Sequence, residues 1–293
     1  MVSITASEVP TAKLHGYLLG AVGPRPIAFA STIDDRNRPN LSPFSFFNVF
    51  GSNPPILIFS PSRRVRDNST KHTLENVLKN REVVINVVNY DMVQQMSLAS
   101  TEYMEGENEF IKSGLTMLPS DLVKPFRVAE SPVQFECKVV KVEPLGKEGG
   151  AGNLIFSEVL KIHVDADILD ENGAIDQFKI DQVARMGGNW YSRANMGLFE
   201  VPKPVSNLGI GVDQIPEHIR WSNILTGNDL GMLGNMEKLP SQEEVRQYVD
   251  TNVDLRSILS SGDEALLHAR AQELLKNKDV LSAWKVLLAE MPT

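Results

Sequence analysis

The sequence predicts an α+β protein in which a small antiparallel β-barrel precedes a helical C-terminal extension. Two observations lead to this fold class. Short, apolar, β-prone runs separated by turn residues fill much of the first two-thirds of the chain, a pattern typical of a compact antiparallel sheet. Strong helical periodicity is concentrated beyond Leu239, so strands come early and helices late, as in the α+β class.

The first part of the chain contains one expected helix and three expected strands. Residues Thr11–Ala21 form a helical pattern that ends at Gly23-Pro24, because proline cannot continue the ladder of helical hydrogen bonds. Turn residues at 34–40 and 53–55 separate the strands that follow. The expected strands are Ile27–Ile33, Leu41–Phe50 and Ile56–Ser60.

A long hairpin is expected in the middle of the chain. Apolar and polar residues alternate from Val133 to Val142, and the turn Gly146–Gly152 leads to a second strand, Leu154–Val164. These glycines are turn residues, because no Gly-Lys-Ser/Thr motif follows to cradle a phosphate. The elements expected before the hairpin are a helix capped by Thr73 and ending near Arg81, a strand Glu82–Val88, a helix from Asp91 to about Ser100, and an irregular loop with little core over 101–130.

The last third of the chain changes character. Pro202 and Pro204 mark the expected edge of the β-rich part. The expected domains are 1–204 and 205–293. Ser241 and Glu244 have the spacing of a capping box at a helix start. Amphipathic helices are expected at Ala265–Lys276 and Val280–Glu290.

Composition and charge restrict the function classes. The net charge of −8 argues against non-specific binding to nucleic acid, which needs a cationic face. The single cysteine, Cys137, excludes an intramolecular disulfide and falls on an apolar strand face, and the five histidines are too scattered to predict a metal site. No signal-peptide pattern and no run long enough to span a membrane is present, so we expect a cytoplasmic protein.

The loop after the third strand is the first candidate site. It gathers hydroxyl, guanidinium and ammonium groups within a dozen residues: Ser62, Arg63, Arg64, Lys71 and Thr73. Arginine offers a bidentate fork to phosphate oxygens, lysine offers a point charge, and the expected helix start adds its positive end. The loop therefore suits a phosphate group, and the alternative is a solvated loop with ordinary surface charges.

A second candidate site lies on neighbouring strands. Ser31 and Thr32 are on the first expected strand, and Ser45, Phe46 and Asn48 are on the second. A flavin ring has an apolar face and a polar edge, so it needs a few hydroxyl or amide groups set among aromatic side chains. The alternative is a barrel wall in which the aromatic side chains are core, the serines bond the backbone and the asparagine closes a turn.

The motifs RPIAF, AST, NLSPFSFFN, NPP, the basic loop, KHT and VIN follow one another along the chain. In this order they resemble the flavin-reductase-like family of FMN-binding split-barrel proteins, over roughly Thr11 to Pro204. The resemblance implies a six-stranded antiparallel barrel of Greek-key type with flanking helices, a homodimer and tight FMN binding. In many members it also implies reduction of flavin by NADH or NADPH.

The resemblance also assigns roles to single residues. Ser31 and Thr32 match positions at the edge of the ring, and Ser45, Phe46 and Asn48 match the segment that lines it. Ser62, Arg63, Lys71 and Thr73 match the phosphate and ribityl contacts, and Arg185, Gly188 and Tyr191 match a loop near the nicotinamide side. His72 departs from the Lys-Asp-Thr of many members, and the part beyond about Asn207 exceeds the minimal family domain.

The leading hypothesis is an FMN-binding oxidoreductase that reduces flavin with NADH or NADPH and supplies reduced flavin or electrons to a partner monooxygenase. No catalytic residue is expected, because the cofactor carries the redox chemistry, and no Gly-x-Gly-x-x-Gly motif marks a separate dinucleotide domain. One alternative is an electron carrier or a flavoprotein with a non-flavin acceptor, which retains FMN beneath the helical extension. Another is a barrel-based binding module without cofactor. Replacing Arg63 and Lys71 by Ala is expected to release FMN.

Overall fold

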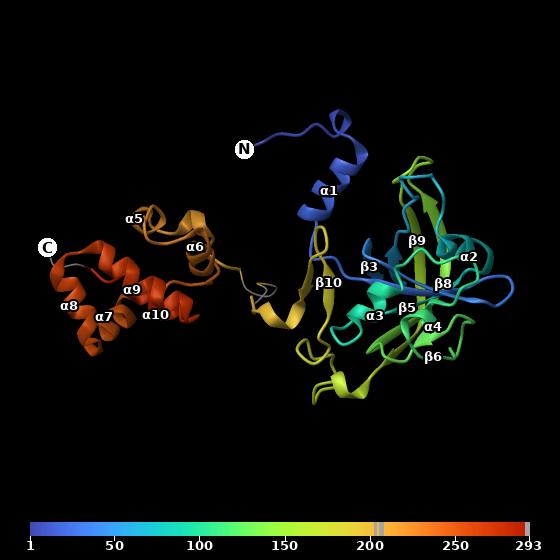
Figure 1. The fold of residues 1–293 in the computed structure, drawn as a ribbon. Coiled ribbons are helices and arrows are strands. Elements are labelled where there is room, and N and C mark those ends of the chain that lie inside the picture. Colours follow the sequence, from blue (N-terminus) through green and yellow to red (C-terminus); the bar gives the residue numbers. More distant parts are fainter. Residues whose placement is uncertain (202–203, 205–207, 291–293) are drawn as a thin grey trace. The chain divides into compact units, whose positions relative to one another are not determined.

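The computed structural model describes residues 1–201, 204 and 208–290. The chain divides into two compact units, Met1–Phe199 and Glu200–Thr293. The first is rich in strands and the second is helical (Figure 1). Of the two prolines expected at the domain edge, Pro202 lies outside the described residues.

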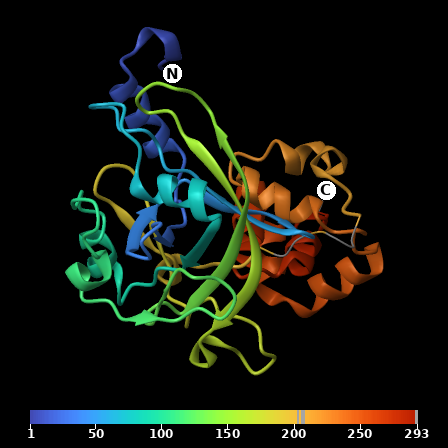
Figure 2. The ribbon, with the colours of Figure 1, turned by 90° about the vertical axis from the view of Figure 1, so that its right-hand side faces the viewer.

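The first unit is built on one seven-stranded sheet with the order β2-β1-β5-β8-β9-β4-β3, in which every neighbouring pair is antiparallel. Its strands are β1 (Ala28–Ile33), β2 (Pro39–Phe44), β3 (Phe47–Ser52), β4 (Pro55–Phe59), β5 (Glu82–Asn86), β8 (Val133–Pro144) and β9 (Asn153–Val164). Figure 2 shows the long, curved hairpin of β8 and β9 in green to yellow-green.

The sheet closes into a split barrel at a bend between β2 and β3. These strands lie at opposite ends of the sheet order, yet only Ser45 and Phe46 separate them in the chain. Three residue steps reach at most about 10 Å, so the two sheet edges must lie close together. The expectation of one continuous strand over Leu41–Phe50 is therefore wrong, because β2 and β3 are separate strands. If this bent strand is counted once, the barrel has the six strands that the resemblance implies.

Two apolar clusters fill the two sides of the sheet. Ala28 and Ala30 of β1 belong to the barrel core with Phe59 and Cys137, whereas Phe29 packs into a second cluster on the other face. This explains why all of β1 is buried and why its sequence shows no regular alternation of apolar and polar residues. Cys137 is a core residue as expected, and burial raises the pKa of its thiol.

Four α-helices, two short strand pairs and the 3-10 helices η1 (Ala6–Glu8), η2 (Ala166–Ile168) and η3 (Ala194–Gly197) complete the first unit. The α-helices are α1 (Thr11–Ala21), α2 (His72–Asn80), α3 (Val93–Leu98) and α4 (Glu109–Ser113), with β6 (Met117–Leu118) paired to β7 (Arg127–Val128), and β10 (Val183–Arg185) paired to β11 (Tyr191–Arg193). Leu74 and Val77 of α2 pack into the barrel core, and Met96 of α3 packs into the second cluster.

Two expectations for this part of the chain are wrong. Residues 101–130 are not a loop with little core, because Phe110 of α4, Leu115 and Val128 are buried in the second cluster. Thr73 is not the cap of α2. That helix begins at His72 after Lys71, and Thr73 is buried against the barrel.

The described part of the second unit contains six α-helices and one short 3-10 helix, η4 (Val212–Gln214). The α-helices are α5 (Glu217–Arg220), α6 (Gly227–Gly234), α7 (Gln242–Thr251), α8 (Val253–Ser261), α9 (Glu264–Lys276) and α10 (Val280–Leu287). Trp284 is fully buried, and its indole Nε1 donates a hydrogen bond to the Leu233 carbonyl at 3.1 Å. The expected capping box of Ser241 and Glu244 is present at the start of α7.

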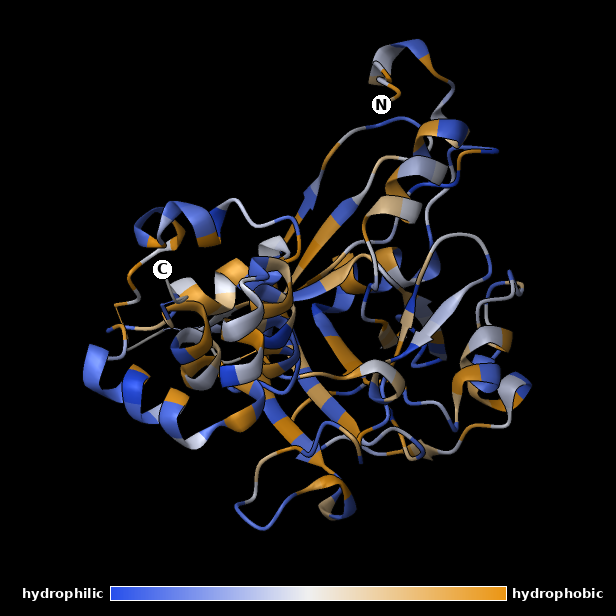
Figure 3. Ribbon diagram, turned by 90° about the vertical axis from the view of Figure 1, so that its left-hand side faces the viewer, coloured by the Kyte–Doolittle hydropathy of each residue, from blue (hydrophilic) through white to orange (hydrophobic). Residues whose placement is uncertain are grey.

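Hydropathy follows the same organisation. In Figure 3 apolar and polar bands alternate along strands of the sheet, and the helices of the second unit carry polar and apolar stripes. Among the described residues, no helix is both long enough and apolar enough to cross a membrane.

Candidate functional site

Three cationic side chains between β4 and α2 surround one carboxylate. The Glu102 carboxylate lies 2.9 Å from Arg64 Nε, 3.0 Å from Arg66 Nη2 and 3.7 Å from Lys71 Nζ. We call Arg64, Arg66 and Lys71 the cation cluster. Charged donors that converge on two carboxylate oxygens form an arrangement that also suits the oxygens of a phosphate.

The loop holds Arg64 in place by further hydrogen bonds. Arg64 Nη1 donates to Ser69 Oγ at 2.9 Å and to the Thr70 carbonyl at 2.5 Å. The Ser69 amide and hydroxyl in turn donate to Asp67, and they hold the pKa of that carboxyl at about 2. The loop is therefore internally bonded rather than a set of freely solvated charges.

Arg63 does not belong to the cation cluster, and its guanidinium group bonds within the loop instead. Its Nε donates to Asn68 Oδ1 and its Nη2 to the Asn68 carbonyl, both at 2.6 Å. The Arg63 amide donates to the Ala151 carbonyl at 2.8 Å, and Ser62 forms a β-bridge with Gly152. Ser62 and Arg63 thus join the basic loop to the turn between β8 and β9, and two guanidinium nitrogens of Arg63 are already used within the loop.

The charged groups of the cluster influence one another. Burial and the positive charge of Arg64 lower the pKa of Lys71. Hydrogen bonds from Arg64 and then Arg66 lower the pKa of Glu102, which keeps this carboxyl ionised at neutral pH. An anion beside Lys71 favours the charged form of the amine, so the site is electrostatically suited to a negatively charged group.

Thr32 and Thr73 meet in a buried polar network. Asn40 Nδ2 donates to Thr73 Oγ1 at 3.0 Å and to Thr32 Oγ1 at 3.3 Å, and Asn76 Nδ2 donates to Thr32 Oγ1 at 3.0 Å. All four residues are buried. The network fixes the first turn of α2, next to Lys71, against β1 and β2.

The bend between β2 and β3 lies beside the start of the basic loop. The Ser60 amide donates to the Phe46 carbonyl at 2.9 Å. Phe46 is exposed, and its ring forms a T-shaped pair with His15 of α1, with the ring centroids 6.2 Å apart. Asn48 is exposed on β3, and its side-chain oxygen accepts from the Val49 amide. The chain thus brings the expected ring-lining segment next to the expected phosphate loop.

Ser31, unlike Thr32, takes no part in the buried polar network. It is fully buried on β1, and its hydroxyl has no hydrogen-bond partner among the described residues. A ligand at the surface therefore does not reach this hydroxyl without a rearrangement of the side chains that cover it.

Arg185, Gly188 and Tyr191 come together in the β10–β11 hairpin. The Arg185 guanidinium lies 4.6 Å from the centre of the Tyr191 ring, and Gly188 has a positive φ of 58° in the turn. This hairpin packs on α1. A Cβ at Gly187 would lie 3.1 Å from Gly20 Cα, a tight contact, so the two segments approach closely at this glycine.

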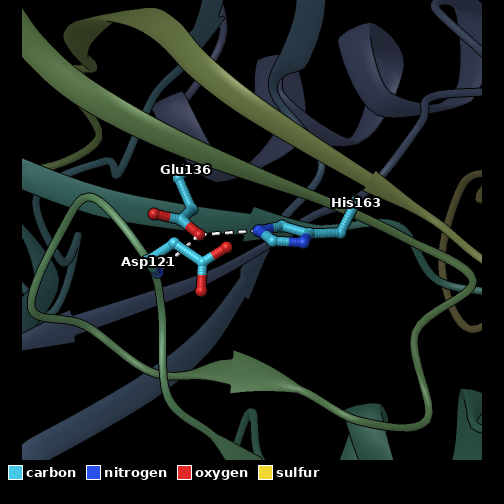
Figure 4. A group of neighbouring side chains, drawn as sticks. All are labelled: Asp121, Glu136 and His163. Carbon is cyan, nitrogen blue, oxygen red and sulfur yellow. Dashed lines mark hydrogen bonds and ion pairs between the residues drawn. The ribbon is translucent and has the colours of Figure 1, made fainter.

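One cluster of titratable groups lies apart from these residues (Figure 4). Glu136 of β8 is fully buried, and one of its oxygens lies 2.6 Å from His163 Nε2. The Asp121, Leu122 and Val123 amides donate to the same carboxylate at 2.9, 2.6 and 3.2 Å. Both oxygens of Glu136 therefore accept hydrogen bonds from N–H groups, and these donors would repel a cation. Asp121, Glu136 and His163 lie close enough together to resemble a metal site, but we interpret them as a structural group.

Sequence reasoning selects Arg64 and Lys71 of the cation cluster, counts Arg66 only as part of the same basic loop, and misses Glu102. Arg66 shares its loop with the selected residues, and the density of basic residues was the available signal. Glu102 lies 31 positions after Lys71 in a stretch without periodic pattern, so no local signal joins it to the basic loop.

A family model with the description "Flavin reductase like domain" matches residues 21–179. The chain belongs to this family. An uncharacterized protein of Aquifex aeolicus is 41% identical over 181 residues, which are 62% of this chain and 90% of that protein. The family match lies within the first unit.

Two solved structures give the same result for the fold. Nitrilotriacetate monooxygenase component B from Bacillus cereus is similar with a TM-score of 0.65 and 25% identity, over 69% of this chain and 98% of that one. A split-barrel domain protein from Shewanella frigidimarina NCIMB 400 is similar with a TM-score of 0.59 and 25% identity, over 69% and 100%. The first unit is accordingly a flavin-reductase-like split barrel.

Proposed function

We propose that this protein binds FMN and reduces flavin with NADH or NADPH. The observation that carries the proposal is the cation cluster, in which Arg64, Arg66 and Lys71 converge on a single anionic group. A phosphate monoester carries close to two negative charges at neutral pH and offers three acceptor oxygens. The donor set therefore fits the phosphate of FMN.

The residues around the cluster would hold the rest of the cofactor. Ser62 and the start of α2 adjoin the cation cluster, and the Ser60–Phe46 hydrogen bond places Ser45 and Phe46 at the head of the same loop. Exposed Phe46 and Asn48 offer an aromatic face and an amide to a flavin ring. Thr32 and Thr73 act through the buried network that fixes α2.

The bound flavin would supply the redox chemistry, taking electrons from the nicotinamide and passing them on. The chain's own part is to bind, to orient and to limit water. In this proposal Arg185, Gly188 and Tyr191 lie on the nicotinamide side, where the guanidinium offers a cation to a dinucleotide phosphate and the hairpin is fixed against α1.

We also propose that the protein is a cytoplasmic homodimer that serves a partner monooxygenase. Large apolar side chains remain exposed on β3, β8 and β9, which is unusual for a monomer surface. They are Val49, Phe50, Val140, Leu160, Ile162 and Val164. The partner follows from the likeness to a protein that is itself named as a monooxygenase component.

A second candidate is a flavoprotein that keeps its FMN and passes electrons to a non-flavin acceptor. The internally bonded basic loop favours it, because a site with few free rotations releases its ligand slowly. The rate at which bound FMN exchanges with free FMN separates the two candidates.

Paired titrations with FMN and riboflavin test the phosphate site. Riboflavin has the same ring and lacks the phosphate. Arg64→Ala and Lys71→Ala should each weaken FMN binding by about tenfold or more, because each removes a charged hydrogen-bond donor, and should leave riboflavin binding unchanged. Lys79→Ala, which removes an exposed lysine of α2, is the matched control. An unchanged FMN affinity in both cluster variants would refute the assignment.

A further inference from the structure

The geometry points to Glu102 as an internal competitor of the flavin phosphate: its carboxylate occupies the cation cluster when no phosphate is bound and must leave when FMN binds. This inference rests on the proposed function. The inference extends the proposed function, because it names Glu102 as the residue that sets the affinity and the exchange rate of FMN. Glu102 lies outside the basic loop that would bind the phosphate.

The first step is that the carboxylate already accepts hydrogen bonds from donors that a phosphate would also use. Arg64 Nε has one hydrogen, and this atom donates to Glu102 Oε1 at 2.9 Å. Arg64 Nη1 is held by Ser69 and Thr70, so Nε, which Glu102 uses, and Nη2 are the guanidinium nitrogens that remain for a ligand. A bidentate contact to a phosphate through Nε and Nη2 needs the hydrogen that Glu102 accepts. Arg66 Nη2 donates to Glu102 Oε2 at 3.0 Å. A phosphate bound by Arg64 Nε therefore displaces Glu102 from that donor.

The second step is that Glu102 can leave without unfolding its segment. Residues 104–107 are fixed independently, because Arg38 Nη2 donates to Glu105 Oε1 at 2.7 Å and the Met104 amide donates to Glu107 Oε2 at 2.9 Å. Arg38 is itself paired with Asp34. Glu102 is 44% exposed and makes its side-chain hydrogen bonds only to the basic loop among the described residues.

The third step is that the carboxylate of Glu102 and the phosphate of FMN can replace each other reversibly in the cation cluster. Glu102 is 44% exposed in both ion pairs, and ion pairs that water reaches are individually weak, so the carboxylate lowers the affinity for phosphate without closing the site. When phosphate leaves, Glu102 returns to the cluster, so the neighbouring cations Arg64 and Lys71 regain a carboxylate partner. Arg66 keeps a second partner throughout, because its Nε lies 3.2 Å from Asp67 Oδ2. Such a competitor favours the exchange of flavin over its permanent retention.

The test compares Glu102→Gln with Glu105→Gln. Both changes remove one carboxylate charge from the same segment, but Glu105 pairs with Arg38 and not with the cluster. Glu102→Gln should tighten FMN binding by about threefold to tenfold and slow FMN release, since the competing state is removed. Riboflavin affinity should not change, and Glu105→Gln should match the unsubstituted protein. Flavin fluorescence quenching measures the affinities, and stopped-flow displacement measures the release rates.

The results that would overturn the role of Glu102 differ from the result that would overturn the proposed function. If Glu102→Gln leaves FMN affinity unchanged or weakens it while the melting temperature is unaltered, Glu102 is at most a support for the arginines and the inference is wrong. An equal gain for riboflavin would also overturn it, because the effect would not involve phosphate. If the unsubstituted protein binds no FMN, the proposed function itself fails.

Discussion

At the scale of single residues, Glu136 is a buried charge whose hydrogen-bonding capacity is filled. Three backbone amides of residues 121–123 and His163 Nε2 meet its two oxygens. A buried carboxylate is tolerated only when such partners replace water. Glu136 therefore attaches the segment before β7 to the face of β8.

Replacing this carboxylate by an amide should destabilise the first unit. In Glu136→Gln the side-chain NH2 faces N–H donors and leaves at least one buried group unpaired, so the free energy of unfolding should fall by about 2–3 kcal/mol. Urea unfolding followed by circular dichroism measures the change. Asp121→Asn is the control: the side chain of Asp121 pairs with exposed Lys161, so its loss should cost less than about 1 kcal/mol.

The same residue should contribute to acid sensitivity. Burial raises the pKa of Glu136, but hydrogen bonds from the Asp121 amide and His163 outweigh it, and the net pKa lies below the usual value. A carboxyl of this kind stabilises the fold above its unfolded pKa of about 4.3, and the contribution is lost as the pH falls through the lower folded pKa. Glu136→Gln should therefore show a shallower acid-side decline in stability than the unsubstituted protein.

The sequence located several residues of the candidate site but not their partners. Lys71 and Thr73 could be selected because a basic, hydroxyl-rich loop precedes a helix. Their contacts come from elsewhere: Thr73 bonds to Asn40, and Lys71 faces Glu102. Tertiary packing brings these pairs together, and no local spacing encodes them.

At the scale of elements, α1 is held to the barrel by one buried arginine. The Arg25 guanidinium donates to the Leu19 and Val22 carbonyls near the end of α1, and to the Met186 carbonyl at 2.8 Å in the β10–β11 hairpin. No side chain of α1 itself is buried. The position of the helix beside the hairpin therefore depends strongly on this fork of donors (Figure 1).

Arg25→Lys should loosen α1 while the sheet remains intact. A lysine ammonium keeps the charge but cannot reproduce the planar fork that reaches both segments. Amide hydrogen exchange should speed up across Thr11–Ala21 and not in β5 or β8. Arg36→Lys, at an exposed arginine of the turn after β1, is the matched control. Unchanged exchange in α1 would show that other contacts hold the helix.

Most strands and helices of the first unit could be predicted to within about two residues, since their apolar patterns and turn residues are local. The bend at Ser45–Phe46 could not. Its two flanking strands are both β-prone, and only closure of the barrel sends them to opposite edges of the sheet. Helix α4 was missed because it is five residues long, too short to show helical periodicity.

At the scale of the whole molecule, the exposed apolar side chains on β8 and β9 are expected to lie in a subunit interface. Ile162→Glu would place a charge there and should shift the protein from dimer to monomer in sedimentation velocity experiments. Leu266→Glu changes a comparably exposed leucine of α9 in the second unit and should leave the mass unchanged. A monomeric unsubstituted protein would refute the dimer.

Every candidate ligand of the flavin lies in Met1–Phe199, and the family model ends at residue 179. The second unit has its own apolar core around Trp284. A chain ending at Phe199 should therefore fold and bind FMN with unchanged affinity, as isothermal titration calorimetry can measure. A large loss of affinity would instead support an extension that covers the flavin.

The central claim is that this split barrel reduces flavin with a nicotinamide nucleotide. Anaerobic titration of the FMN-loaded protein with NADH and then NADPH, followed by visible absorption, tests it most directly. The account predicts rapid bleaching of the flavin band by one nucleotide, and continued oxidation of that nucleotide when free FMN is added in excess. A bound flavin that neither nucleotide bleaches would contradict the claim.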